Sequence, residues 1–355
     1  MKKMKYVMWF LIVPLMASLI LTNCKKDDDD PVPVDFTVLD ARITEAQDLH
    51  DAAVEGTAIG EYEAGSKAAF QVAIDLATDV RNAAGIQASV DAAVVNLQAA
   101  IDGFESKKIT EIAPENLIAN WLFNGDATDA SGNSHDGTLE VGHVNWGGGS
   151  VISVEDRFGN ADYAYKFEGG GNIVVPQDPS LNPPELTIVT WINLYETWAH
   201  SYFLSNDIWN CWKFQVQDAN KPFFTRKILK DDGSGENAWI DKDANTGILE
   251  NGVWTHIAMT YQSGEMIFYI NGEETMLWDD FPTGTPVDPN PLVDICIGQS
   301  LPTSAFSDVP GDPYEWKEWL GYLKGSLDDL KMYNIVLTGT QVNQIYIWEV
   351  ANVVE

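Results

Sequence analysis

Carboxylate and amide side chains gather in one short stretch of the chain, where Asp126, Asp129 and Asn133 stand close together. A second acidic pair, Asp328 and Asp329, begins the last long strand that the sequence predicts. Calcium takes six to eight oxygen ligands, partly from backbone carbonyls, so a loop of this composition facing a carboxylate from elsewhere suits the ion. The sequence therefore predicts a structural calcium site on Asp126, Asp129, Asn133 and Asp328.

The same loop has a second interpretation, in which Asp129, Ser131 and Asn133 only hold a turn through bonds from side chain to backbone. The overall charge does not separate the two interpretations. The chain has 53 acidic and 21 basic residues and a net charge of -32, and such acidity also keeps extracellular proteins soluble. Because this charge repels phosphate backbones, the sequence predicts no nucleic-acid partner.

Six tryptophans lie outside the core motifs, mostly in segments that also contain Asn, Asp and His. They are Trp198, Trp209, Trp239, Trp278, Trp316 and Trp319. Sugar rings pack their faces on aromatic rings while neighbouring amides and carboxylates bind the hydroxyls, so this inventory suits a glycan-binding surface. Trp209 and Trp239 flank the longest polar insertions and are the first candidates, with Trp198 as the third. Packing within loops is the alternative role for each ring.

The sequence shows no recognisable catalytic machinery. Glycosidases need two carboxylates at a defined separation, and no Glu-x-Asp-x-x-Glu run is present. His-Glu-x-x-His and phosphate-binding loops are also missing from the sequence. His200 and His256 have no Cys or Ser nearby in a nucleophile context. The sequence therefore predicts a protein that is not an enzyme, with an undetected sugar-active enzyme as the weakest alternative.

Two cysteines, Cys211 and Cys296, stand in the predicted strand region. Neither is in the obvious core phase of its strand. In an oxidising location they could form a disulfide across a sheet face, although sequence cannot test the distance between them.

The elements that position these residues are short strands. From about residue 112, segments of alternating hydrophobicity follow one another with turn signals between them, and Asn271-Gly272 is typical of a type I′ hairpin turn. Five phrases occur in the order found in LamG, or concanavalin A-like, jelly-roll domains: 121–133 (WLFNGDATDASGN), 186–192 (LTIVTWI), 254–261 (WTHIAMTY), 269–272 (YING) and 325–334 (GSLDDLKMYN).

Residues 115–351 therefore resemble this family. The resemblance implies an all-β sandwich in which Trp121, Trp191 and Trp254 pack in or beside the core. It also implies that the first loop and Asp328 meet at a calcium ion. Helical spacing of Val342, Ile345 and Tyr346 predicts a closing helix against the sandwich.

Residues 36–107 are rich in alanine, contain no proline and carry three apolar stripes at helical spacing, which predicts an all-α three-helix bundle. The first stripe runs from Val38 through Ala46 to Ala53. The phrases 59–66 (IGEYEAGS) and 94–101 (VVNLQAAI) resemble the FIVAR modules that recur in extracellular and sugar-active proteins. A small core of this kind leaves no room for a pocket and favours a spacer.

The N-terminus carries an export signal. Lysines precede an apolar run, and Leu21-Thr22-Asn23-Cys24 resembles the lipobox at which signal peptidase II acts. Residues 1–23 are thus predicted to be a lipoprotein signal peptide, with Cys24 lipidated. Acyl chains then anchor the protein without a membrane span. The run 24–35 (CKKDDDDPVPVD) is predicted to be an extended acidic tether, and its Lys-Asp pattern resembles a signal for display on the outer surface of the outer membrane.

Together these features predict a multidomain surface lipoprotein that binds an extracellular glycan through its β-sandwich. A non-catalytic subunit that binds a surface protein with the same sandwich is the first alternative.

Overall fold

The computed structural model describes residues 33–56, 59–83, 85–245 and 248–351. Contacts divide the chain into one unit of residues 1–53 and 67–106 and a second of residues 54–66 and 107–355. The predicted signal peptide, Cys24 and most of the predicted tether lie outside the described residues. Among the described helices, none combines the length and the apolar character that crossing a membrane requires.

The described part of the first unit consists of three helices, α1 (Thr37–Ala52), α2 (Ser66–Asn82) and α3 (Gln87–Glu105). They share a small core in which the rings of Phe70 and Phe104 stack with centroids 4.4 Å apart. In α1 the buried positions are Leu39 and Ala46, whereas Val38 is exposed. The first stripe was therefore assigned partly to the wrong face of the helix.

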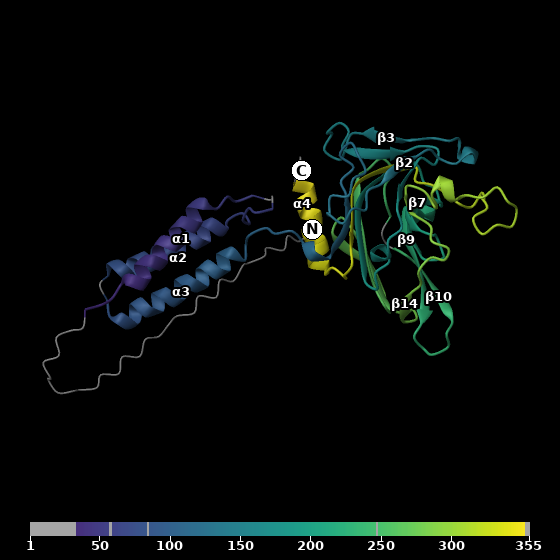
Figure 1. Cartoon of the computed structure of the whole chain (residues 1–355). Coiled ribbons are helices and arrows are strands. Elements are labelled where there is room, and N and C mark those ends of the chain that lie inside the picture. Colours follow the sequence, from purple (N-terminus) through teal and green to yellow (C-terminus); the bar gives the residue numbers. More distant parts are fainter. Residues whose placement is uncertain (1–32, 57–58, 84, 246–247, 352–355) are drawn as a thin grey trace, which may run out of the picture. The chain divides into compact units, whose positions relative to one another are not determined.

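Two antiparallel sheets form the second unit (Figure 1). In the described residues the first sheet has the order β13-β12-β11-β6-β16-β4-β3, with β1 paired to β16. Its strands are β1 (Leu117–Trp121), β3 (Val151–Val154), β4 (Ala164–Phe167), β6 (Leu186–Leu194), β11 (Thr255–Gln262), β12 (Glu265–Ile270), β13 (Glu273–Trp278) and β16 (Gly325–Tyr333).

The second sheet has the order β10-β9-β8-β7-β15-β5-β2, with β14 paired to β9. Its strands are β2 (Thr138–Glu140), β5 (Asn172–Val175), β7 (Ser201–Asn206), β8 (Trp212–Gln217), β9 (Lys221–Lys230), β10 (Asn237–Asp243), β14 (Gly284–Pro286) and β15 (Ile295–Ile297). Helices followed by a two-sheet jelly-roll sandwich confirm the predicted fold class, with the concanavalin A-like fold as its β part.

The main hydrophobic core lies between the sheets, because strands such as β8 alternate Trp212 and Phe214 inward with polar residues outward. Both outer faces are covered as well. The predicted closing helix is α4 (Gly339–Ala351), which packs Val342 and Ile345 on the first sheet. On the second sheet, the segment 298–323 packs Leu301 and Leu320 in a separate apolar cluster.

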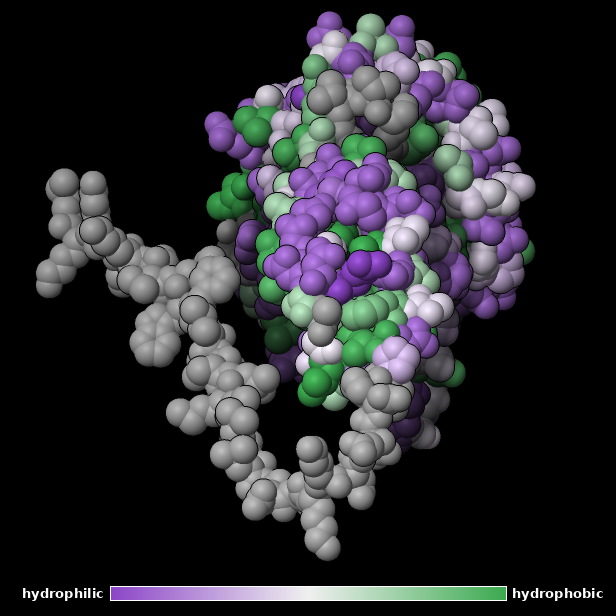
Figure 2. All heavy atoms as spheres, turned by 90° about the vertical axis from the view of Figure 1, so that its left-hand side faces the viewer, coloured by the Kyte–Doolittle hydropathy of each residue, from purple (hydrophilic) through white to green (hydrophobic). Residues whose placement is uncertain are grey.

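Polar residues predominate on the face shown in Figure 2, where hydrophobic residues form small groups between them. Scattered single apolar side chains are usual on a soluble surface.

Candidate functional site

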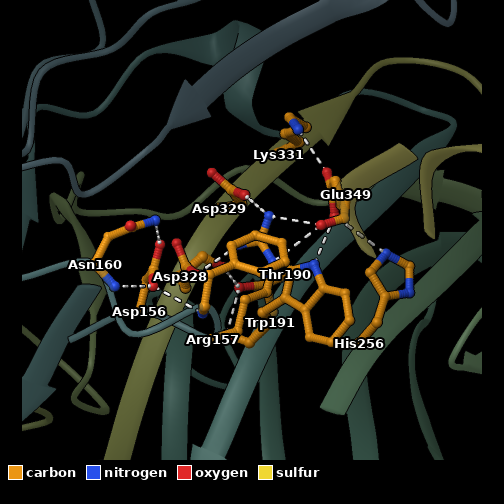
Figure 3. A network of polar contacts seen from close by, with 11 residues as sticks. Asp156, Arg157, Asn160, Thr190, Trp191, His256, Asp328, Asp329, Lys331 and Glu349 are labelled. Carbon is orange, nitrogen blue, oxygen red and sulfur yellow. Dashed lines mark hydrogen bonds and ion pairs between the residues drawn. The ribbon is translucent and has the colours of Figure 1, made fainter. Parts of the chain in front are cut away.

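Asp328, one of the predicted calcium ligands, belongs to a buried ionic network (Figure 3). The Arg157 guanidinium pairs with Asp328 at 2.5 Å and with Asp329 at 2.7 Å, and each of the three side chains is at most 7% exposed. It also donates two hydrogen bonds, of 3.1 and 3.2 Å, to the Glu349 carbonyl of α4. Its cation lies 5.0 Å from the Trp191 ring.

A β-bulge explains how two consecutive residues reach one guanidinium. Side chains of neighbouring residues on a regular strand point to opposite faces. In β16 the pairing with β6 shifts between Asp328 and Lys331, and Asp329 has a φ of 46°. The extra residue turns the second carboxylate to the side of the first.

The rest of the network balances its charge. Glu349 accepts from Lys331 at 2.5 Å and from the Trp191 indole at 2.8 Å, and its carboxylate lies 3.6 Å from His256. Burial lowers the pKa of His256 to about 3, so this ring is neutral. Burial and the adjacent Asp329 raise the pKa of Asp328, whereas the Arg157 guanidinium lowers it. The network is thus a closed structural assembly that fastens α4 to the first sheet.

The other predicted calcium ligands hold their own loop. The Asp129 carboxylate accepts backbone hydrogen bonds from Asn120, Ser131 and His135 at 2.9 to 3.0 Å, besides one from the Ser131 hydroxyl. The Asn133 amide donates to the backbone carbonyl of Leu117. These contacts match the interpretation in which the loop is held by side-chain bonds to the backbone.

Asp126 accepts a hydrogen bond from the Thr128 backbone within the same turn. Within the described ranges no three His, Cys, Asp or Glu side chains form a group that could hold a metal ion. With Asp129 surrounded by donors and Asp328 paired to Arg157, the residues as placed do not fit the predicted ligand set. Calcium binding stays a prediction.

The structure does not form the disulfide that the sequence left possible. Cys211 and Cys296 are free and buried. Cys211 lies in the core cluster between the sheets, whereas the Cys296 thiol contacts the Asn172 amide oxygen at 3.5 Å. The prediction that Cys211 is outside the core phase was therefore wrong, whereas Cys296 does oppose the core residues Ile295 and Ile297 and is buried on the other covered face of its sheet.

The predicted sugar-binding tryptophans do come together in part. Trp209 and Trp319 pack with ring centroids 5.0 Å apart, and the Trp239 indole donates a hydrogen bond to the Trp209 carbonyl at 2.8 Å. Trp239 and Trp319 are about half exposed, at 50% and 48%. Trp198 is not part of this group, since it packs on His200 and Tyr322.

A pocket of about 80 Å³ lies beside Trp209 and Trp319. We call it the tryptophan pocket. Its lining comes from the turn after β7 and from the covering segment, and comprises Asp207, Ile208, Trp209, Asn210, Leu301, Asp312, Pro313, Tyr314, Glu315, Lys317, Trp319 and Leu320. Aromatic rings with a few convergent polar groups are the usual composition of a small-molecule site.

The turn after β7 has a strained backbone. Asp207 and Ile208 have φ values of 52° and 51°, a region in which a β-branched residue such as isoleucine is a genuine outlier. Hydrogen bonds at 3.2 Å from the Asn210 amide and the Tyr314 hydroxyl fix the Asp207 carboxylate. Burial raises the pKa of Asp207 to about 6. Strain held by such contacts is common at ligand sites.

Lys213 lies under the Trp209 ring on the outer face of β8. Its ammonium is 4.6 Å from the Phe223 ring centroid, 5.0 Å from that of Tyr202 and 5.4 Å from that of Trp209. It donates a hydrogen bond of 2.5 Å to the Gln215 amide oxygen. Only 3% of the residue is exposed, and burial lowers the pKa of this ammonium to about 7. Lys213 therefore supports Trp209 from beneath.

Sequence reasoning found Trp209 and Trp239 but gave Trp319 no special rank and missed Asp207 and Lys213. Asp207 follows a buried strand in an ordinary polar phrase, 206–210 (NDIWN), that carries no signal of its own. Lys213 alternates with core residues, which indicated an exposed position.

Comparison with known proteins finds a matching family profile and several similar proteins. Residues 167–343 match the sequence profile of Laminin_G_3, described as the concanavalin A-like lectin/glucanases superfamily. A gellan lyase from Bacillus sp is 41% identical over 80 residues, which cover 22% of this chain and 3% of the lyase. The surface-layer 125 kDa protein of Lysinibacillus sphaericus is 36% identical over 146 residues, 39% of this chain and 12% of that protein. The matches thus span only a small part of both relatives.

Two solved structures illustrate the range of similar folds. Domain 4 of AbnA, a GH43 extracellular arabinanase from Geobacillus stearothermophilus, in complex with arabinotriose, has a TM-score of 0.48 and 21% identity, covering 67% of this chain and 98% of its own. The binding domain of Paraclostridial Mosquitocidal Protein 1 has a TM-score of 0.45 and 19% identity, covering 66% and 52%.

Proposed function

We propose that this chain binds extracellular carbohydrate through the tryptophan pocket of its β-sandwich. The observation that carries the proposal is the convergence of the exposed Trp319 ring, Trp209 and the polar groups of Asp207 and Asn210 on one hollow. The ring faces offer a platform for the apolar side of a sugar, and the carboxylate and amide offer partners for its hydroxyls. The match of the sandwich to a lectin and glucanase superfamily supports the same conclusion.

Replacing Trp319 by alanine tests this proposal. We expect the variant to lose at least tenfold in affinity for its glycan, since truncating a tryptophan anchor at an interface costs about 2 kcal/mol or more and about 1.4 kcal/mol is a factor of ten. The half-exposed ring contributes little to folding, so stability should stay near that of the wild type. The measurement is a glycan array, with and without calcium, followed by calorimetry on the best ligand.

Trp278→Ala is the matched control, because Trp278 lies at the end of β13 and does not line the pocket. It should keep the wild-type affinity. An equal loss of glycan affinity in both variants would mean that the binding site is not the tryptophan pocket. A wild-type protein that binds no glycan, with or without calcium, would refute the proposed function. Binding to surface proteins in that case would favour the accessory-subunit alternative, and release of products from a polysaccharide panel would favour an enzyme.

The proposal also includes the cellular location of the protein. Cys24 would carry the lipid, the acidic tether and the FIVAR-like helical module would act as a spacer, and the sandwich would face the cell exterior. Support for this part comes from the sequence, namely the lipobox-like 21–24 (LTNC) and the Lys-Asp run after it.

Metabolic labelling with an alkyne fatty acid tests the lipid anchor. We expect label on the wild-type chain and none on Cys24→Ala, which should keep its signal peptide because the residue at the cleavage site has changed. Protease treatment of intact cells then tests the outward orientation. Label that persists in Cys24→Ala would contradict the assignment.

A further inference from the structure

Asp207 is a buried carboxylate on which the positive charge of Lys227 acts only from a distance. It is 1% exposed, it lines the tryptophan pocket, and its two side-chain donors are neutral groups at 3.2 Å. Among the described residues no ion pair within 4.0 Å includes it. A buried carboxylate held by only two long neutral hydrogen bonds retains a large desolvation penalty, which a cationic ligand would offset.

The charges around the hollow have the same sign. Three carboxylates line it, those of Asp207, Asp312 and Glu315, against one ammonium from Lys317. That ammonium already pairs with Glu315 at 2.6 Å. The lining therefore attracts cations and repels anionic sugars such as uronic acids.

The aromatic rings are suited to the same kind of ligand. Indole faces attract ammonium groups, and Trp209 already holds the Lys213 ammonium 5.4 Å from its ring centroid. Trp319 packs against Trp209 and is half exposed beside the pocket. The volume of about 80 Å³ accommodates about three waters, or an ammonium with the ring atoms that carry it.

We propose that the tryptophan pocket selects amino sugars with a free ammonium group, which binds against Asp207 beside Trp319. This inference rests on the proposed function and names its ligand class. Vicinal hydroxyls would bind the amide of Asn210, and the ammonium would supply a positive charge close to the carboxylate.

Two oligosaccharides of the same linkage separate charge from shape. We expect a β-1,4-linked glucosamine trimer to bind the full-length mature protein at least tenfold more tightly than its N-acetylated counterpart at pH 6.5, measured by calorimetry. Asp207→Asn keeps the side-chain size and both neutral contacts but removes the charge. It should lose about tenfold for the free amine and little for the acetylated trimer.

Two controls address the net charge of -32, which attracts any polycation. Asp279→Asn removes the same charge at an exposed position outside the pocket and should keep the wild-type preference. A linear polyamine should bind the wild type and Asp207→Asn equally. If Asp207→Asn still preferred the free-amine trimer over the acetylated trimer, the preference would come from general charge attraction, and the inference would be overturned.

The pH dependence of the wild type gives a second readout if Asp207→Asn does not fold. Because Asp207 titrates at about pH 6, affinity for the free amine should fall as the pH drops from 6.5 to 5. The sugar amine gains protons over this interval, so its own titration would change affinity in the opposite direction.

The groups that face Asp207 do not produce this fall. Tyr314 has its pKa raised to about 12, and burial also raises the pKa of the Cys211 thiol, so neither group titrates between pH 5 and 6.5. At the rim, the hydrogen bond from Lys317 lowers the pKa of Glu315. Tighter or equal binding of the acetylated trimer, or an affinity for the amine that rises below pH 6, would overturn the inference while glycan binding itself stood. Binding to no sugar would refute both proposals.

Discussion

Replacing Arg157 by methionine is expected to destabilise the sandwich by about 3–5 kcal/mol, the range found when one partner of a buried ion pair is removed. The variant leaves Asp328 and Asp329 facing each other without the guanidinium that contacts both. It also removes two hydrogen bonds to the Glu349 carbonyl at the end of α4. The helix should therefore loosen along with the strand.

Urea unfolding followed by tryptophan fluorescence measures this effect on the sandwich alone, since every tryptophan after Trp9 lies between Trp121 and Trp348. Lys230→Met is the matched control. Lys230 also pairs with two carboxylates, Asp232 and Glu236, but both partners are well exposed, so the loss should stay below about 1 kcal/mol. Combining Arg157→Met with Asp328→Asn and Asp329→Asn should restore part of the stability. A loss below about 1 kcal/mol for Arg157→Met would show that the pairs are not buried as described.

Replacing Lys213 by methionine is expected to change how stability depends on pH. In the folded protein burial lowers the pKa of this ammonium to about 7, although the negative charge of Asp241 opposes the shift. The unfolded chain keeps the usual lysine value of about 10.4. Between these two values the unfolded chain binds more protons, so stability should rise with pH by up to about 1.4 kcal/mol per unit.

Methionine fills the space among Tyr202, Trp209 and Phe223 without a charge to desolvate. The variant should therefore be more stable than the wild type at pH 7, and the difference should shrink toward pH 10. Subtracting one unfolding curve from the other cancels the titration of Asp207 and Asp328, which is common to both. A difference that is constant with pH would mean that the ammonium is solvated in the folded protein. Lys227→Met is the control for the loss of a lysine charge, because Lys227 is a half-buried lysine whose ammonium lies over the Trp239 ring.

The fold class could be predicted because its signals are local. Alternation in β8 and β11 and helical spacing in α3 each follow from residues near in sequence. It was harder to predict that both faces of the second sheet are buried. The alternation of apolar and polar residues in β8 identifies only the face toward the core, and Lys213 lies on the opposite face. The segment 298–323 that covers it is far away in sequence and has no periodic pattern.

The candidate site was predictable only in its aromatic part. Trp209 and Trp239 stood out because they flank the longest polar insertions of the strand region. The role of Asp328 could not be predicted, because it depends on the bulge that turns Asp329 to the same side and on Arg157, which lies 171 residues earlier. The Asp328 carboxylate is a group that could bind calcium, but in the structure Arg157 forms an ion pair with it.

The place of β16 in the first sheet has a consequence for biosynthesis. This strand pairs with β1, β4 and β6, so residues 325–333 supply the centre of the sheet. The contact between Asn116 and Asn334 closes a loop of 218 residues, and pairings so distant in sequence slow folding. A ribosome must therefore reach residue 333 before the sandwich can form. A nascent chain that stays unfolded this long could still pass through a translocation pore, which the proposed export to the cell surface would require.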